Sequence, residues 1–126
     1  MQTREAIIEN YIAGYNEMDL QKMTRDLDES VIFKNVSNGT VDIELNGLAS
    51  FYEQAQKALA IFSERKQTVT AIRHQYDAVE ADISYYAVLA RDLPEGPQKG
   101  QELRLTGVAV FTFNKDNRIT SITDIS

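Results

Sequence analysis

Apolar residues at helical spacing predict three helices in the first half of the chain. The stripe of the first consists of Ile8, Tyr11, Ile12 and Tyr15, at i, i+3, i+4 and i+7. It predicts a helix over residues 3–17 with Thr3 as the N-cap. Asp19 is predicted to cap a short second helix, whose apolar face consists of Leu20, Met23 and Leu27. A third helix is predicted to open at Asn46-Gly47, and its stripe consists of Leu48, Phe51, Tyr52, Ala55, Leu59 and Phe62.

The rest of the chain alternates between apolar and polar residues, as strands do. Strands over residues 31–36 and 41–45 are predicted to form a hairpin around Asn38-Gly39, a strong turn signal. Further strands are predicted over residues 67–75, 78–91, 102–113 and 118–126, with a proline-containing loop over residues 93–100. This order predicts one α+β domain over residues 1–126, in which a strongly curved sheet of about six strands wraps around the helices and leaves an internal pocket.

The strand predicted over residues 78–91 has two unlike faces. One face is fully apolar and includes Tyr85. The other mixes polar and apolar groups and consists of Glu80, Asp82, Ser84, Tyr86 and Val88. A half-exposed strand normally carries charge on its wet face. The mixed face is therefore predicted either to be wet surface or to line a cavity, and the Tyr85 face is predicted to be an interface.

The strand predicted over residues 102–113 is apolar on both faces, so it needs two covers. The helices supply one of them. Because so short a chain has no further helices, a second protomer is the simplest source of the other. We therefore expect a homodimer that forms through the sheet face.

The charge balance limits the expected partners. The net charge is −6 at pH 7 and the 13 basic residues are scattered along the sequence. Because nucleic acid binding needs clustered Lys and Arg, we expect no nucleic acid partner. The same acidity disfavours an anionic membrane surface, so we expect no membrane partner. The absence of cysteine excludes disulfides, thiolate metal sites and a cysteine nucleophile. A cytoplasmic location fits this composition, and we expect neither a signal peptide nor a membrane-spanning segment.

The sequence offers no obvious site for a metal or a cofactor. A single histidine, His74, excludes an all-histidine metal site within one chain. It stands at the end of a predicted strand, beside a tight turn, so a surface or turn-bonding role is predicted for it. No glycine-rich phosphate loop lies between a strand and a helix. We therefore expect no cofactor and no metal.

Several short runs, taken in order and spacing, resemble the nuclear transport factor 2-like superfamily. They are Tyr11-Ile12, Asp19, Val31-Ile32-Phe33-Lys34-Asn35, Gly47 before Phe51-Tyr52, and Phe113-Asn114-Lys115-Asp116-Asn117-Arg118-Ile119. The resemblance covers nearly the whole chain. This superfamily includes the SnoaL-like proteins, the ketosteroid isomerases and the limonene-epoxide hydrolases. The resemblance implies a cone-shaped α+β barrel with a pocket at its open end and dimerisation through the sheet.

The resemblance to ketosteroid isomerases implies a carboxylate base at the end of the first strand, a tyrosine from the first helix and a protonated Asp on a later strand. Tyr11 matches the tyrosine, but the base position is occupied by Asn35 and the acid position by Ala109. An asparagine cannot accept the proton as a base does. Steroid isomerisation of that kind is therefore not expected.

The resemblance to epoxide hydrolases implies a water held by Tyr, Asn and Asp, with an Arg-x-Asp pair that protonates the epoxide. Asn35 and Asp124 are in register with two of these groups, while Phe33 replaces the tyrosine. The middle strand has Asp82-Ile83-Ser84 where the Arg-x-Asp pair would stand. Epoxide opening would therefore lack its usual acid.

Asp124 is the leading catalytic candidate. The register of the last strand predicts that Ile122, Asp124 and Ser126 face the pocket, where desolvation would raise the pKa of a carboxylate and suit it to acid–base work. The alternative is a solvated carboxylate near the chain end. Asn35 is the second candidate, predicted either to orient a water or a carbonyl, or to bond the turn that follows its strand.

The other residues predicted to line the pocket are Tyr11, Tyr15, Phe33, Asp82, Ser84, Tyr86, Ala109, Phe111 and Ile122. Core packing is the alternative for the two helix tyrosines, because a tyrosine has an apolar body and a polar tip. A rim in water is the alternative for the polar face of the strand over residues 78–91.

Two functions of different kinds are compatible with this pattern. One is a small enzyme that acts by acid–base catalysis on a compact, mostly apolar molecule, in an isomerisation, cyclisation, dehydration or hydration. The other is a non-catalytic carrier or sensor whose polar residues only orient a small apolar or partly polar ligand. A homodimeric interaction module with a filled interior is a third possibility.

Overall fold

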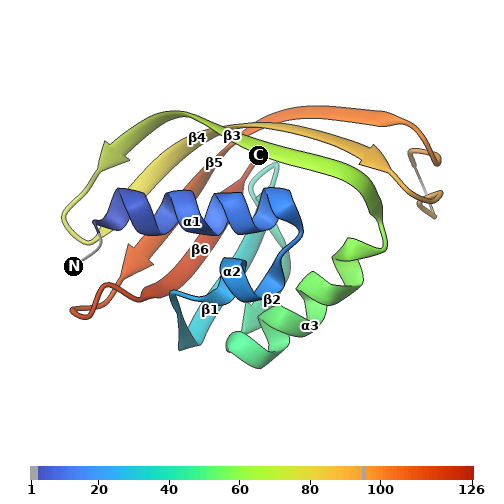
Figure 1. Ribbon diagram of the computed structural model, residues 1–126. Coiled ribbons are helices and arrows are strands. Elements are labelled where there is room, and N and C mark those ends of the chain that lie inside the picture. Colours follow the sequence, from blue (N-terminus) through green and yellow to red (C-terminus); the bar gives the residue numbers. More distant parts are fainter. Residues whose placement is uncertain (1–2, 95) are drawn as a thin grey trace.

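Three helices lie against the concave face of one curved six-stranded sheet (Figure 1). The computed structural model describes residues 3–94 and 96–126. The elements are α1 Arg4–Glu17, α2 Leu20–Thr24, β1 Leu27–Ser37, β2 Thr40–Asn46, α3 Leu48–Leu59, β3 Phe62–His74, β4 Ala78–Leu89, β5 Glu102–Phe113 and β6 Ile119–Ile125. The predicted loop over residues 93–100 includes position 95, and the predicted domain includes positions 1 and 2, all of which lie outside the described residues.

The sheet is mixed and unclosed, in the order β2-β1-β6-β5-β4-β3. The last strand inserts between β1 and β5, parallel to β1 and antiparallel to β5. This insertion aligns Asn35 of β1, Asp124 of β6 and Ala109 of β5 in one row. Residues paired in this way share a face of the sheet, so the two candidate polar side chains are neighbours.

Local signals in the sequence account for most element ends. The Thr3 hydroxyl accepts from the Ala6 amide, and the Asp19 carboxylate accepts from the Lys22 amide, as expected of N-caps. The hairpin turn has Asn38 at φ 52° and Gly39 at φ 79°, the left-handed pair that a tight β-hairpin requires.

Two residues that the apolar spacing predicts in helices begin strands instead. Leu27 is predicted on the face of the short helix, but it opens β1 and pairs with Ile119 of β6. Phe62 is predicted on the third helical stripe, but it opens β3 and pairs with Leu89 of β4. In both cases pairing with a distant strand overrides the local helical period.

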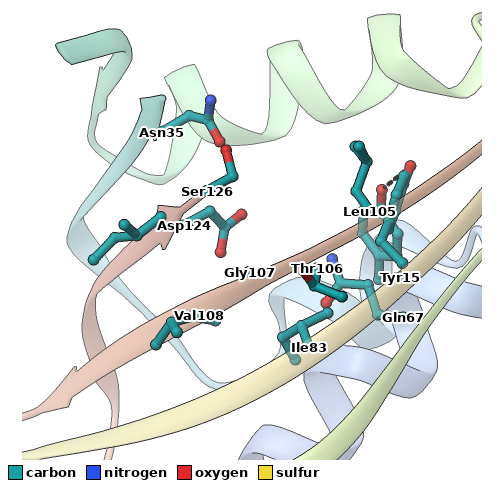
Figure 2. Close-up of a pocket in the computed structure, with 13 residues that line it drawn as sticks. Tyr15, Asn35, Gln67, Ile83, Leu105, Thr106, Gly107, Val108, Asp124 and Ser126 are labelled. Atoms are coloured by element: carbon teal, nitrogen blue, oxygen red, sulfur yellow. Dashed lines mark hydrogen bonds between the residues drawn. The ribbon is translucent and has the colours of Figure 1, made fainter. Parts of the chain in front are cut away.

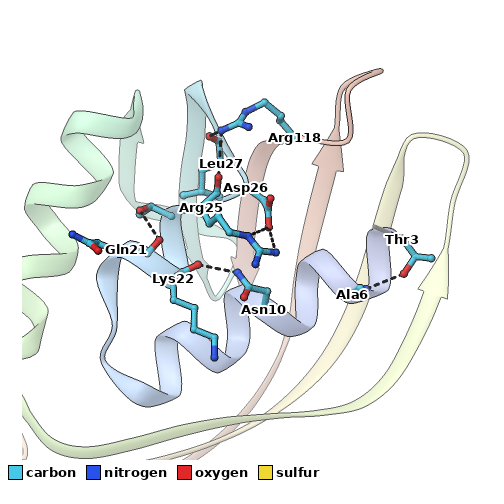
Figure 3. Close-up of polar contacts among 10 residues, drawn as sticks. Thr3, Ala6, Asn10, Gln21, Lys22, Arg25, Asp26, Leu27 and Arg118 are labelled. Atoms are coloured by element: carbon cyan, nitrogen blue, oxygen red, sulfur yellow. Dashed lines mark hydrogen bonds and ion pairs between the residues drawn. The ribbon is translucent and has the colours of Figure 1, made fainter. Parts of the chain in front are cut away.

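Helix α1 crosses the concave side of the sheet and supplies much of the core (Figure 1). Tyr11 is buried, and its ring meets that of Phe111 edge to face at a centroid distance of 5.7 Å. Polar contacts also hold the helix in place. The Asn10 amide donates to the Lys22 carbonyl at 2.9 Å, which ties α1 to α2 (Figure 3).

The end of α1 is also fixed to the edge strand β3. The side-chain amide of Asn16 donates to the Gln67 carbonyl at 3.0 Å and accepts from the Gln67 amide at 2.7 Å. One side chain thus satisfies both backbone groups of an edge residue, as a neighbouring strand would. This double contact fixes Tyr15, which precedes Asn16, relative to the inner face of β3.

Candidate functional site

A cavity of about 230 Å³ lies between the end of α1 and the inner face of the sheet. Its floor is formed partly by small residues, because Gly107 and Ala109 of β5 stand opposite Ile83 and Ala81 of β4. Larger side chains at these two β5 positions would fill the space. The lining consists of Tyr15, Asn35, Gln67, Ile83, Tyr85, Leu105, Thr106, Gly107, Val108, Ala109, Asp124, Ile125 and Ser126.

The cavity lies beside a notch in the sheet. The pairing of β6 with β5 ends at Ile125 and Val108, whereas β5 itself extends back to Glu102. At the notch the Ile125 carbonyl oxygen approaches Gly107 so closely that a Cβ there would lie 2.7 Å from it. Only glycine allows this approach, so Gly107 both shapes the floor and admits the end of β6.

Asp124 directs its carboxylate into the cavity (Figure 2). Burial raises the pKa of this carboxyl to about 6. No hydrogen bond or ion pair from the described residues reaches it, so nothing in that part of the chain offsets the cost of its charge. A carboxyl of this kind exchanges its proton close to neutral pH, which suits an acid–base role.

Tyr15 lies at the opposite end of the cavity, across Gly107 from Asp124 (Figure 2), and Tyr85 lines the cavity beside it. The hydroxyls of Tyr15 and Tyr85 are 2.9 Å apart. Burial raises the pKa of both phenols, so both remain protonated at neutral pH. One hydroxyl donates to the other, and the accepting hydroxyl keeps its own proton for a further acceptor. This end of the cavity is therefore a hydrogen-bond donor.

Arg65 lies behind the tyrosine pair. It is only 5% exposed. The guanidinium carbon stands 3.8 Å from the centre of the Tyr15 ring, and Nε donates to the Tyr15 carbonyl at 2.9 Å. Nη2 is buried without a hydrogen-bond partner among the described residues. A buried cation thus lies behind one end of the cavity, and a partly buried carboxylate lies at the other end.

Five of the residues predicted to face the pocket line this cavity: Asp124, Asn35, Tyr15, Ala109 and Ser126. The Asn35 amide nitrogen donates to Asp42 at 2.8 Å and to Ser37 at 3.3 Å. Asn35 therefore makes the contact predicted near the turn and also lines the cavity. Its side-chain carbonyl oxygen accepts no hydrogen bond from the described residues and can accept one from an occupant.

The structure places the other predicted pocket residues elsewhere. Tyr11, Phe111 and Ile122 are buried in the core. Phe33 packs its ring against Phe51 at a centroid distance of 5.6 Å. These four side chains contribute to the apolar core and do not line the cavity.

The polar face of β4 is the outer surface of the sheet. Asp82 forms an ion pair with Arg73 at 2.8 Å, Ser84 is exposed, and the Tyr86 hydroxyl donates to Glu102. Alternation along the strand puts Ile83 and Tyr85 on the other face, which lines the cavity. Asp82, Ser84 and Tyr86 thus lie outside the cavity, and Tyr85, predicted at an interface, lines it.

Sequence reasoning missed Arg65, Gln67 and Tyr85. The run Glu64-Arg65-Lys66 has the pattern of a solvated charged segment. The signal that could have found the site is the alternation along β3, which puts Arg65 and Gln67 on the same face as Val69. A large cation among apolar positions on one strand face indicates burial beside a polar site.

His74 lies at the surface, with Nε2 3.5 Å from the Glu5 carboxylate. Among residues 3–94 and 96–126, no group of three or more His, Cys, Asp or Glu side chains is arranged to hold a metal ion. Within the same residues, no helix has the length and apolar character to cross a membrane.

The arrangement of three helices against an unclosed mixed sheet is that of the nuclear transport factor 2-like superfamily. More narrowly, residues 8–122 match the SnoaL-like domain family, and the chain belongs to that family. No curated protein matches the chain in sequence.

Solved structures are similar over nearly the whole chain. A proposed polyketide cyclase from Xanthomonas campestris pv. campestris has a TM-score of 0.80 at 21% identity, over 98% of this chain and 89% of its own. IdmH, a proposed polyketide cyclase from Streptomyces antibioticus, has a TM-score of 0.78 at 16% identity, over 98% and 91%. An NTF2-like protein of unknown function from Burkholderia pseudomallei has a TM-score of 0.80 at 11% identity, over 98% and 90%. At such identities the similarity establishes the fold alone.

Proposed function

We propose that this chain binds a compact, mostly apolar small molecule in the cavity and transfers a proton on it, with Asp124 as the acid–base group. The observation that carries the proposal is the position of Asp124. Its carboxyl faces an apolar cavity, has no partner among the described residues, and has a pKa raised to about 6 by burial. The chain belongs to the SnoaL-like family, and the solved structures similar to it include proposed polyketide cyclases. Both findings are consistent with this role.

The two ends of the cavity suit the removal of a proton from carbon next to a carbonyl group. Ionised Asp124 would take the proton, and the carbonyl oxygen would gain negative charge. The free hydroxyl proton of the Tyr15–Tyr85 pair would stabilise that oxygen, as preorganised donors do. Asn35, held by Asp42, would orient a polar group beside Asp124. Isomerisation, cyclisation and dehydration next to a carbonyl group can each proceed through such an enolate.

The proposal is tested by proton exchange on bicyclic ketones such as 2-tetralone and 1-indanone in D₂O, followed by NMR. We expect the protein to accelerate exchange next to the carbonyl, and Asp124→Asn to lower that rate about 100-fold or more. Asp77→Asn, an exposed carboxylate in the β3–β4 turn, is the matched control and should leave the rate unchanged. Binding of these ketones without faster exchange would instead identify a carrier or sensor.

We also propose that the chain forms a homodimer through the outer face of the central strands. Strand pairing puts Ile32, Val110 and Thr123 on the face opposite to Asp124, and Ile32 is 38% exposed. The three helices of the described residues lie against the other face of the sheet (Figure 1). Uncovered apolar surface of this kind often marks an interface. Sedimentation equilibrium at tens of micromolar should show a dimer, and Val110→Lys should shift it to monomer, because the new charge would be buried. A monomeric wild type at that concentration would contradict the proposal.

A further inference from the structure

Arg65 is a buried cation without a carboxylate partner among the described residues. Its one hydrogen bond there runs from Nε to the Tyr15 carbonyl, in the last turn of α1. The carbonyl end of a helix carries a partial negative charge, so it offsets only part of the guanidinium charge. Nη2 remains buried and unpaired. A buried guanidinium that is only partly paired lowers the stability of the folded protein. Its uncompensated positive charge lies next to the tyrosine end of the cavity.

We propose that the Tyr15–Tyr85 end of the cavity is an anion site that holds the ionised oxygen of a small organic anion, a carboxylate or an enolate. The free proton of the tyrosine pair would donate to that oxygen, and Gln67 lines the same end with a further amide donor. Arg65 acts from behind the Tyr15 ring, 3.8 Å from its centre, as a positioning residue that supplies charge without touching the occupant. This inference rests on the proposed binding of a small molecule, and it specifies that the molecule is an anion.

The shape of the cavity separates this anion from Asp124. Gly107 lies between the two ends, and Ala109 pairs with Asp124 at the carboxylate end, so an apolar ring system would cover Gly107 while its ionised oxygen meets the tyrosines. The occupant would compensate the positive end without placing its own charge against the carboxylate. A neutral occupant would leave the Arg65 charge uncompensated. An anionic occupant would interact strongly with that charge, because interactions between charges are strong where water is excluded.

Two matched pairs of probes test the charge of the occupant by isothermal titration calorimetry at about pH 8. One pair is 2-naphthoate and its neutral analogue 2-acetonaphthone; the other is ionised indane-1,3-dione and neutral 1-indanone. We expect the wild type to bind the anion of at least one pair about tenfold more tightly than its neutral analogue. Arg65→Met keeps the apolar bulk and should abolish that preference, with the neutral compound bound as before.

Arg73→Met is the control, because Arg73 lies on the same strand but on the outer surface, paired with Asp82. It should leave all affinities unchanged. Tyr85→Phe removes only a hydroxyl and provides a second test that does not depend on the folding of the Arg65 variant. It should weaken anion binding selectively. A preference in the naphthoate pair alone identifies a carboxylate site, and a preference in the indane pair alone identifies an enolate site.

The inference is overturned if the wild type binds the neutral compounds as tightly as the anions, or if Arg65→Met and Tyr85→Phe weaken both members of a pair equally. The second result would show that Arg65 only supports the packing of α1. Naphthoate has no exchangeable proton next to its carboxylate, so its binding is independent of turnover. Anion preference without ketone exchange would therefore contradict the proposed catalysis but not the anion site.

Discussion

Asp124→Asn is expected to raise the free energy of unfolding by about 2–3 kcal/mol at about pH 8, even though it removes the proposed acid–base group. Burial raises the pKa of Asp124 from 3.8 to about 6. The folded protein therefore holds this proton more tightly than the unfolded chain does. Above the folded pKa the carboxyl must be ionised in an apolar cavity, and that cost lowers stability. Asparagine resembles the protonated form and does not incur it.

The sign of the pH dependence follows from the same shift. Stability contributed by this group is complete below pH 3.8 and is lost as the pH rises through about 6. Apart from a constant offset, the wild type and Asp124→Asn should therefore have the same free energy of unfolding below pH 3.8. Their free energies of unfolding should diverge between pH 3.8 and about 6. Urea denaturation across this pH range measures the difference. A gap of equal size at both ends of the range would show that Asp124 is not desolvated in the folded protein.

Most of the fold was predictable because the relevant signals are local. Thr3 and Asp19 cap the helices that the sequence predicts them to cap, and the Asn38-Gly39 turn closes the first hairpin. The errors at Leu27 and Phe62 have one cause, because both are paired with strands far away in the sequence. Apolar periodicity gives no information on pairing with a distant strand. Each predicted helix was therefore extended by one apolar position into the strand that follows it.

The candidate site was only half accessible from the sequence. The prediction that Asp124 faces the pocket follows from alternation along the last strand and from the register that the resemblance to the epoxide hydrolases implies. Tyr85 was not assigned to the site, because the polar groups on the other face of its strand were predicted to line the pocket, whereas the apolar face lines the cavity and the polar face meets water. Arg65 was obscured by its charged neighbours. A buried cation is a long-range feature, since the helix carbonyl and the ring it meets belong to Tyr15.

Gly14→Ala is expected to destabilise the protein by about 2–3 kcal/mol, the reverse of the gain of about 1 kcal/mol that alanine normally gives inside a helix. A Cβ at position 14 would lie 2.5 Å from the Met23 backbone nitrogen and 2.7 Å from its Cα. Because the clash is with backbone, repacking of the Met23 side chain cannot relieve it. Helix α2 would have to move away, although Asn10 and the buried Leu20 hold it in place.

Urea denaturation of Gly14→Ala measures this cost, and Gly96→Ala is the control. A Cβ at position 96 would meet no atom within 4 Å beyond its chain neighbours, and the backbone there is not left-handed, so alanine should be neutral or slightly stabilising. A Gly14→Ala protein as stable as the wild type would mean that α2 can shift at little cost. The cavity should also respond, because Tyr15 follows Gly14 directly. A shift of α1 would lengthen the 2.9 Å contact between the Tyr15 and Tyr85 hydroxyls and weaken the donor end of the site.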